Sequence, residues 1–193
     1  LIEFAEEGSL EQALLSPKSV ASLGSMKSVF LAIALGLAHL HSRGILHRDL
    51  KPSNILLKRD TKTNTLIPMI SDFGEASLAS GAEKSRTGAT GTIEYTAPEL
   101  LRTDIRGQFQ GRHSTASDIW SLGMIFYECL YRRLPFSDCD DYDKLHEELC
   151  GLETINIPLN DNVSPPLRSL LRAMLSVDPE ERPTIMYVIE ILK

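Results

Sequence analysis

The sequence predicts a mainly helical α+β fold in which a short β-hairpin lies among the helices. Apolar residues recur at three- and four-residue steps in several segments, which is the spacing of an amphipathic helix. Residues 119–130 are apolar on nearly every face, as in a helix that is buried on all sides. Two short apolar runs, Ile55–Leu57 and Leu66–Ile70, have the length of strands and form the expected hairpin.

Two helices are predicted near the start of the chain. Ser9 and Gln12 have the spacing of a capping box, which begins a short helix that runs through Leu15. A longer helix follows and ends before Gly44, because glycine readily adopts the left-handed conformation of a helix stop. The apolar stripe of this longer helix consists of Met26, Val29, Phe30, Ile33, Leu37 and Leu40.

Three further helices are predicted after residue 138. Within the acidic stretch 138–148, a short amphipathic helix presents either a solvated face or a docking surface. Ser164 followed by Pro165 is a typical helix start. The apolar faces are Leu145 and Leu149 in the first helix, Leu167, Leu170, Leu171 and Met174 in the second, and Ile185, Val188, Ile189 and Leu192 in the last.

The predicted hairpin has an irregular second strand. Pro68 cannot donate a ladder hydrogen bond, so the strand 66–70 is expected at a sheet edge. The polar residues 58–65 between the strands are more than a tight turn needs, and we expect them to form a surface excursion.

Composition is typical of a single globular domain of 193 residues. The net charge of −6 lacks the basic footprint of a nucleic-acid-binding protein, so no nucleic-acid partner is expected. The longest apolar run, Val29–Leu40, falls short of the roughly 20 residues that span a bilayer. The three cysteines form no C-x-x-C pair, which favours reduced thiols in an intracellular protein. The cytoplasm is the expected location, and the nucleus stays open as a second.

The stretch His47–Leu57 concentrates the polar residues that indicate chemistry. Asp49 can accept a proton, Lys51 can hold a phosphate, and Asn54 offers a neutral oxygen to a hard cation such as Mg²⁺. The apolar strand that follows Asn54 would hold this loop rigidly. A rigid loop suits phosphoryl transfer, which requires mainly positioning and charge stabilisation.

This stretch resembles the catalytic loop of the protein kinase family. Residues 72–74 (Asp-Phe-Gly) resemble the metal-binding triplet, residues 97–99 (Ala-Pro-Glu) the end of the activation segment, and residues 118–123 the buried helix beneath the site. The resemblance implies the large lobe of a kinase, a helical bundle whose β-hairpin carries the catalytic and metal-binding loops. The lysine at position 51 is typical of the serine/threonine type.

The resemblance also implies the roles of the site residues. Asp49 would be the general base, with Lys51 steadying the transferred phosphate of ATP. Asn54 and Asp72 would hold Mg²⁺ between an amide oxygen and a carboxylate. The cofactor-binding set is then Glu3, Ala5, Lys51, Asn54, Leu56 and Asp72, of which Glu3 and Ala5 would face the adenine through their backbone and Ile2 would be the gatekeeper.

Other residues have implied structural roles. His47, Phe73 and Gly74 would pack around the loops without taking part in the chemistry. Asp118 either caps its own helix or hydrogen-bonds the backbone of the His-Arg-Asp turn, and the resemblance favours the turn. Arg182 would form a bidentate, structural ion pair with Glu99.

Regulation is implied by Arg48, whose guanidinium could pair with a phosphate on the segment 75–96. The alternative is that this segment is a plain flexible loop. Thr92, or else Thr96, would bond the catalytic aspartate and lysine. The candidate phosphosites are Ser85, Thr87 and Thr90, and an upstream kinase would be a second partner beside the protein substrate.

The resemblance begins at the hinge, which we place at residues 1–8, with the large lobe at 9–193. No stretch has the pattern of the small lobe, so this polypeptide alone is expected to have little transferase activity and to bind ATP weakly. Two alternatives therefore stay open. One is a kinase-derived pseudokinase, scaffold or binding module, and the other is a small-molecule phosphotransferase.

Overall fold

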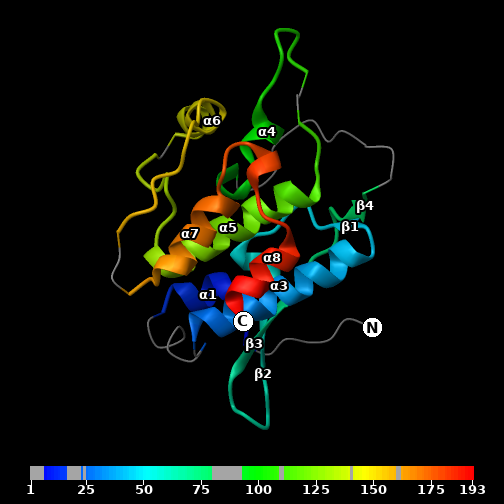
Figure 1. Ribbon diagram of the computed structural model, residues 1–193, viewed down its shortest axis with the longest axis vertical. Coiled ribbons are helices and arrows are strands. Elements are labelled where there is room, and N and C mark those ends of the chain that lie inside the picture. Colours follow the sequence, from blue (N-terminus) through cyan, green and yellow to red (C-terminus); the bar gives the residue numbers. More distant parts are fainter. Residues whose placement is uncertain are drawn as a thin grey trace.

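A computed structural model describes residues 7–16, 23, 25–79, 93–108, 111–139, 141–159 and 162–193. Helices dominate these residues, and two small antiparallel sheets lie beside them (Figure 1). In chain order the elements are α1 (Leu10–Leu14), α3 (Met26–Ser42), β1 (Ile45–Leu46), the 3₁₀ turn η1 (Pro52–Asn54), β2 (Ile55–Arg59), β3 (Leu66–Ile70), β4 (Ser77–Leu78), η2 (Ile93–Tyr95), α4 (Pro98–Leu101), α5 (Thr115–Tyr131), α6 (Tyr142–Cys150), α7 (Pro165–Met174), η3 (Pro179–Glu181) and α8 (Ile185–Leu192).

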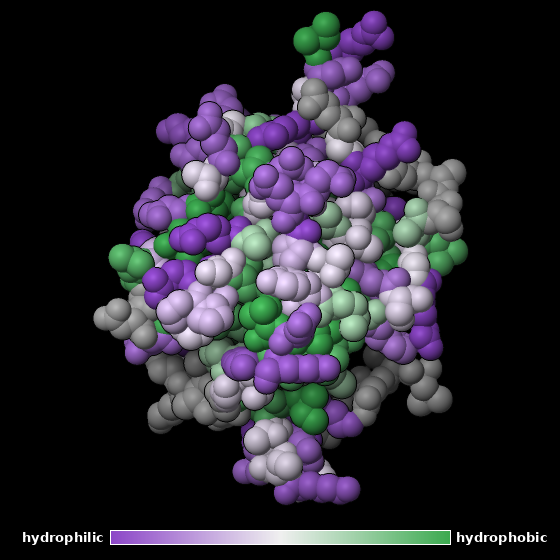
Figure 2. Space-filling model, in the orientation of Figure 1, coloured by the Kyte–Doolittle hydropathy of each residue, from purple (hydrophilic) through white to green (hydrophobic). Residues whose placement is uncertain are grey.

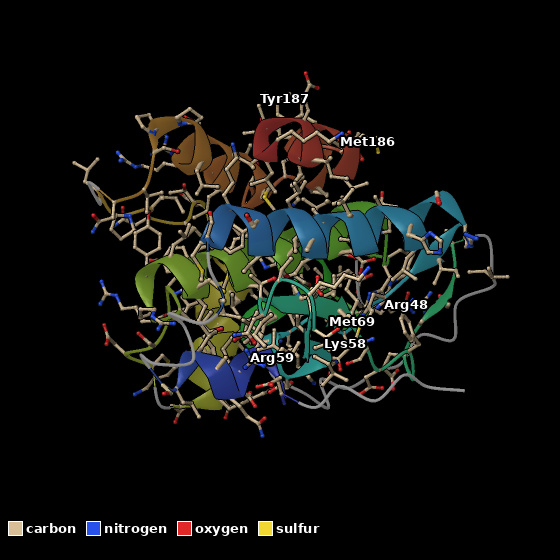
Figure 3. All side chains as sticks on the ribbon, turned by 90° about the horizontal axis from the view of Figure 1, so that it is seen from below. Arg48, Lys58, Arg59, Met69, Met186 and Tyr187 are labelled. Atoms are coloured by element: carbon tan, nitrogen blue, oxygen red, sulfur yellow. The ribbon has the colours of Figure 1, made fainter. Side chains whose placement is uncertain are left out.

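The helix α3 lies in the middle of the molecule. Figure 3 shows α8, with Met186 and Tyr187, on one side of α3, and Lys58, Arg59 and Met69 of the β2–β3 hairpin on the other. The predicted apolar stripe of α3 is buried from Val29 to Leu40. Phe30 of this stripe stacks on Phe126 of α5 with ring centroids 3.9 Å apart. The stripe therefore joins α3 to the centre of the core.

The helix α5 is buried along most of its length, as predicted for residues 119–130. Its first turn is closed by a capping box in which Ser114 Oγ accepts from the Ser117 backbone and Ser117 Oγ accepts from the Ser114 backbone. At Gly123 an added Cβ would lie 2.9 Å from Leu175 Cδ2, so the glycine is needed for the close approach of the segment after α7.

The β2–β3 hairpin has the register Ile55↔Ile70 to Arg59↔Leu66. Residues 7–9 run along the other side of β2, where the Leu57 amide donates to the Gly8 carbonyl at 2.8 Å and Ser9 bridges to Leu56. The strand β3, with Pro68, is therefore the outer strand, as predicted. The strand β1 pairs with β4 in a separate sheet.

Helix boundaries agree with the sequence to within a residue at the start of the chain. The predicted capping box joins Ser9 and Gln12 through two hydrogen bonds, although α1 ends at Leu14 and Leu15 is its C-cap. Gly44 follows α3 with φ +69°, the left-handed conformation expected of this glycine. No helix in the described ranges is long and apolar enough to cross a membrane.

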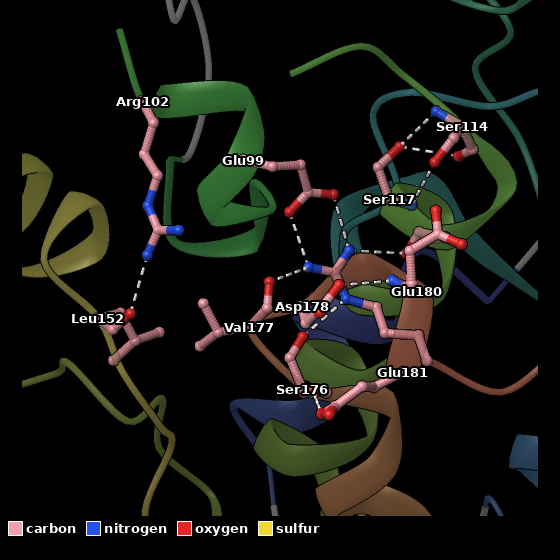
Figure 4. A network of polar contacts seen from close by, with 12 residues as sticks. Glu99, Arg102, Ser114, Ser117, Leu152, Ser176, Val177, Asp178, Glu180 and Glu181 are labelled. Carbon is pink, nitrogen blue, oxygen red and sulfur yellow. Dashed lines mark hydrogen bonds and ion pairs between the residues drawn. The ribbon is translucent and has the colours of Figure 1, made fainter. Parts of the chain in front are cut away.

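Arg182, which follows η3, ties the C-terminal part of the fold to α4. Its side chain is wholly buried, and its Nη1 and Nη2 each donate to one oxygen of Glu99 at 2.7 Å (Figure 4). The remaining guanidinium protons go to the backbone carbonyls of Ser176, Ala116 and Val177. All five donors of the arginine are thus used, in the bidentate geometry expected from the sequence.

The helix α6 is attached to α4 through Arg102. The Arg102 guanidinium donates to the carbonyl oxygens of Cys150 and Leu152, both at 2.9 Å, and so satisfies the C-terminal end of α6. Leu145 and Leu149 bury the apolar face of α6 against Leu101 and Ile93. Its acidic side chains are exposed, as both alternatives from the sequence, a solvated face and a docking surface, require.

Replacing Arg182 with methionine should lower the free energy of unfolding by about 3–5 kcal/mol, because Glu99 would be left as a largely buried, unpaired carboxylate. Urea unfolding measures this loss. The matched Arg182→Lys variant keeps the charge without the planar fork and should lose less. The Glu99→Gln, Arg182→Met double variant should also lose less than the sum of the two single changes. Strict additivity would show that the pair is not coupled.

Candidate functional site

Two loops meet between the two small sheets. Residues 47–51 leave β1 and enter β2 through η1, while residues 71–76 leave β3 and enter β4. The first loop lies between β1 and β2, and the second lies between β3 and β4. Since β1 pairs with β4 and β2 pairs with β3, the two loops begin and end on paired strands. The pairing therefore brings the polar residues of 47–54 beside residues 71–74.

Ser71 makes the closest link between the two loops. Its backbone amide and its hydroxyl both donate to the Asn54 carbonyl oxygen, at 2.9 and 3.0 Å. Asn54 is buried, whereas Asp72 directly after Ser71 is exposed. The contact thus places the two predicted metal ligands on adjoining backbone segments.

Asp49, Lys51 and Asn54 form one connected polar group. The Lys51 ammonium lies 2.9 Å from Asp49 Oδ2, and both side chains are partly exposed. The amide nitrogen of Asn54 donates to the Asp49 carbonyl at 2.8 Å and to Asp49 Oδ2 at 3.0 Å. Donation through nitrogen leaves the amide oxygen of Asn54 as the end that can meet a cation.

His47 is fully buried and connects the two loops. Its Nε2 donates to the Ser71 carbonyl at 3.0 Å, while Nδ1 accepts from the Asp49 amide at 3.4 Å. This pattern assigns the imidazole proton to Nε2. Neither ring nitrogen bonds the side chain of Asp49, Lys51 or Asn54. Its ring packs at a tilt on Phe73, with centroids 5.5 Å apart. A packing role for both residues agrees with this placement.

Asp118, in the first turn of α5, holds the turn that precedes Asp49. Its Oδ2 accepts from the His47 amide and its Oδ1 from the Arg48 amide, both at 3.0 Å. His41 Nε2 approaches Oδ2 at 2.9 Å from the end of α3. Of the two roles weighed for Asp118, the carboxylate takes the contact with the turn.

Arg48 has φ +71°, in the left-handed region that is unfavourable for a residue with a side chain. Such a conformation costs of order 1–3 kcal/mol and persists only where neighbouring groups enforce it. The bond from the Arg48 amide to Asp118 is that restraint. Arg48 Nε is buried and has no hydrogen-bond partner within the described residues.

The triplet 72–74 forms an exposed turn. Asp72 is also left-handed, with φ +59°, and its Oδ1 accepts from the Gly74 amide at 3.3 Å. Phe73 is half exposed. Leu56, predicted to contact the cofactor, is half-buried in β2 beside Ser9.

Tyr95 fastens the residues before α4 to α5. Its hydroxyl donates to Glu128 Oε2 at 2.5 Å, and its carbonyl accepts from the Ser121 hydroxyl at 2.8 Å. Burial raises the pKa of the Glu128 carboxyl, which the hydrogen bond from Tyr95 offsets only in part. Burial, followed by the bond to Glu128, also raises the pKa of the Tyr95 phenol.

Some contacts of the site carried no sequence signal. His41, Ser71 and Glu128 were not predicted as site residues, and their partners Asp118, His47 and Tyr95 lie 77, 24 and 33 positions away. Only for Ser71 does the sequence hold a hint, since it directly precedes Asp72. Several predicted residues lie outside the described ranges: Ile2, Glu3, Ala5, Ser85, Thr87, Thr90 and Thr92.

The donors near the two loops suit a hard cation. In the part of the chain that is described, no three His, Cys, Asp or Glu side chains converge as a metal cage. Asn54 and Asp72 offer one amide oxygen and one carboxylate. Such a sparse oxygen set fits Mg²⁺, which usually keeps several waters and binds substrate phosphates beside one or two carboxylates. The site thus fits a metal that arrives with a nucleotide.

Comparison with known proteins gives a consistent family match. Residues 1–191 match the family model described as protein kinase domain. The chain is 33% identical to the probable serine/threonine-protein kinase iksA of Dictyostelium discoideum, over 98% of this chain and 22% of that protein. It is 35% identical to the ovarian-specific serine/threonine-protein kinase Lok of Drosophila melanogaster, over 98% of this chain and 38% of that protein. The chain therefore spans well under half the length of these relatives.

Replacing Asp118 with asparagine should lower the free energy of unfolding by roughly 1–3 kcal/mol, because the new NH₂ group cannot accept from the amide it faces. Urea unfolding gives the magnitude, and hydrogen exchange at the His47 and Arg48 amides should accelerate. Asp60→Asn is the matched control, since Asp60 accepts from the Lys62 amide in an exposed turn. An equal loss in both variants would argue against a special role for Asp118.

Glu128 should make stability depend on pH. Because burial raises the pKa of the Glu128 carboxyl in the folded state, the folded protein binds the carboxyl proton more tightly than the unfolded chain does. The stability of the wild type relative to Glu128→Gln should therefore fall as pH rises from the ordinary value of 4.5 through the raised pKa, and then level off. Denaturant unfolding of both proteins across this range measures the difference. A difference that grows with pH would contradict the assignment.

Proposed function

This chain belongs to the protein kinase family, and on that basis we propose that its function is to transfer the γ-phosphoryl group of Mg·ATP to serine or threonine hydroxyls of proteins. The observation that carries the proposal is the connected group Asp49, Lys51 and Asn54, joined to the Asp72 loop through Ser71. Phosphoryl transfer depends on positioning and on stabilising charge, and this group supplies both on a rigid framework.

Asp49 is proposed as the general base. Its carboxylate is about one third exposed, so a substrate hydroxyl can approach it, and Asn54 fixes its orientation by donating to Oδ2. A positioned base of this kind contributes about 10²–10⁴-fold to a rate. Lys51 shares the same carboxylate oxygen and places a positive charge where the transferred phosphate would arrive.

Asn54 and Asp72 are proposed to hold the Mg²⁺ that accompanies ATP. The metal would neutralise the charge of the phosphates during transfer. On the protein side, Ser71 sets the position of both ligands, since it bonds the Asn54 carbonyl and directly precedes Asp72. Leu56, Glu3 and Ala5 remain proposed contacts of the nucleotide.

The acceptor is proposed to be a protein serine or threonine. Relatives that cover nearly all of this chain are named serine/threonine-protein kinases, and Lys51 has the position expected of that type. We propose that the activity lies inside the cell, in the cytoplasm, with the nucleus as the second alternative.

Arg48 is proposed to bind a phosphate group that is added to the segment after β4. Its Nε is buried without a partner in the described ranges, so a phosphate brought to it would complete its hydrogen bonding. Ser85, Thr87 and Thr90 are the candidate acceptors, and a separate upstream kinase would modify them.

The test is phosphotransfer by the gene product as its own cells make it, purified through a tag, with Asp49→Asn as the variant. We expect incorporation of phosphate into serine and threonine peptides that requires Mg²⁺ and falls by roughly 10²–10⁴-fold in the variant. The matched control is Asp138→Asn, an exposed aspartate outside the site. Activity that survives Asp49→Asn would refute the assigned base, and transfer only to sugars or antibiotics would refute the protein acceptor.

A further inference from the structure

The segment after α4 projects from the body of the molecule and ends in an ordered turn, residues 104–108 (Figure 1). At this turn Ile105 has a relative exposure of 103%, the highest among the large apolar side chains of the described residues. Figure 2 shows an apolar side chain at the end of this projection among hydrophilic neighbours. Single exposed apolar residues are common on surfaces. Here, however, a hydrogen-bonded turn presents the apolar side chain.

Asp104 builds the turn from within. Its Oδ1 accepts from the amides of Arg106 and Gln108, at 2.7 and 2.9 Å. Its own amide donates to the Gln108 carbonyl at 2.8 Å, its carbonyl accepts from Gly107 at 2.9 Å, and Gly107 has φ +72°. Four hydrogen bonds thus hold a five-residue turn, and Ile105 at its tip is fully exposed. Such preorganisation lowers the entropy lost when a side chain at the tip is bound.

The outward charge of the turn is positive. The carboxylate of Asp104 is directed into the turn, whereas the side chains of Ile105 and Arg106 are exposed. The tip therefore offers an apolar side chain and a guanidinium together, on a chain whose net charge is −6. A complementary surface needs an apolar contact beside carboxylates.

The chain itself carries such a surface at the same end of the molecule. Figure 1 shows α6 and the projecting segment at one end, and Arg102, two residues before Asp104, bonds the C-terminal end of α6. The half-exposed aromatic ring of Tyr142 lies at the start of α6. The carboxylates of Asp141 and Asp143, its neighbours in the sequence, are exposed, and those of Glu147 and Glu148 lie further along the helix.

We propose that the turn 104–108 docks on α6 of a second copy of this chain, with Ile105 against Tyr142 and Arg106 beside the carboxylates of Asp141 and Asp143. In a two-fold arrangement each copy would place its turn on α6 of the other, so that both contacts would form together. Such an isologous arrangement closes as a dimer and does not propagate as a filament. The contact is independent of catalysis, so it holds whether or not the proposed activity is found.

Sedimentation equilibrium of the purified chain over a range of concentrations tests the dimer. We expect reversible dimerisation that weakens as salt is raised, because exposed charges are screened. Ile105→Asp and Arg106→Glu should each raise the dissociation constant by roughly tenfold or more. Combining Arg106→Glu with Asp143→Arg should recover most of that loss, since the charges are exchanged across the interface.

Ile67→Asp is the matched control, because Ile67 is an exposed isoleucine on β3, away from both surfaces. It should dimerise as the wild type does, and circular dichroism should show that every variant is folded. The proposal is overturned if the wild type sediments as a monomer at every concentration at which it stays soluble. It is also overturned if a dimer forms and Ile105→Asp leaves its dissociation constant unchanged.

Discussion

The amides of His47 and Arg48 donate to the two oxygens of one carboxylate, Asp118, and the candidate site depends on this contact. The backbone at Arg48 lies in the left-handed region, which is unfavourable for a residue with a side chain unless a neighbouring group restrains it. Asp118 restrains it from a helix that is itself buried on nearly every side. Since Asp49 directly follows this turn, the direction of its carboxylate is set by a helix almost 70 residues further along the chain.

The helix that carries Asp118 is in turn held at several points. Its first turn has its own capping box, its middle packs Phe126 on Phe30, and Gly123 admits the segment after α7 at close range. Arg182 reaches the Ala116 carbonyl in the first turn of α5 and pairs with Glu99 of α4, with its guanidinium 5.0 Å above the Trp120 ring. The rigidity of the site thus comes from the core and not from the exposed loops that form it.

The polar groups that face solvent are connected to this rigid base by short hydrogen bonds. Asn54 orients Asp49, Ser71 joins Asn54 to the Asp72 loop, and buried His47 links the same two loops through both ring nitrogens. A reaction that needs little covalent participation of the protein gains most from such preorganisation. The turn 104–108 is also held by short hydrogen bonds. Asp104 accepts from the backbone amides within the turn, while the side chains of Ile105 and Arg106 are exposed.

The amphipathic helices, the capping box at Ser9, the outer position of Pro68 and the left-handed Gly44 were all predictable from sequence, because each depends on neighbours within a few residues. The motif residues Asp49, Lys51 and Asn54 were recognisable for the same reason, as they share one short loop. Only the tertiary structure decided that Ser71 couples the loops, that His41 joins Asp118, and that Tyr95 meets Glu128. These contacts join residues far apart in the chain, whose meeting depends on how α3, α5 and the two sheets pack, and no local spacing encodes that packing.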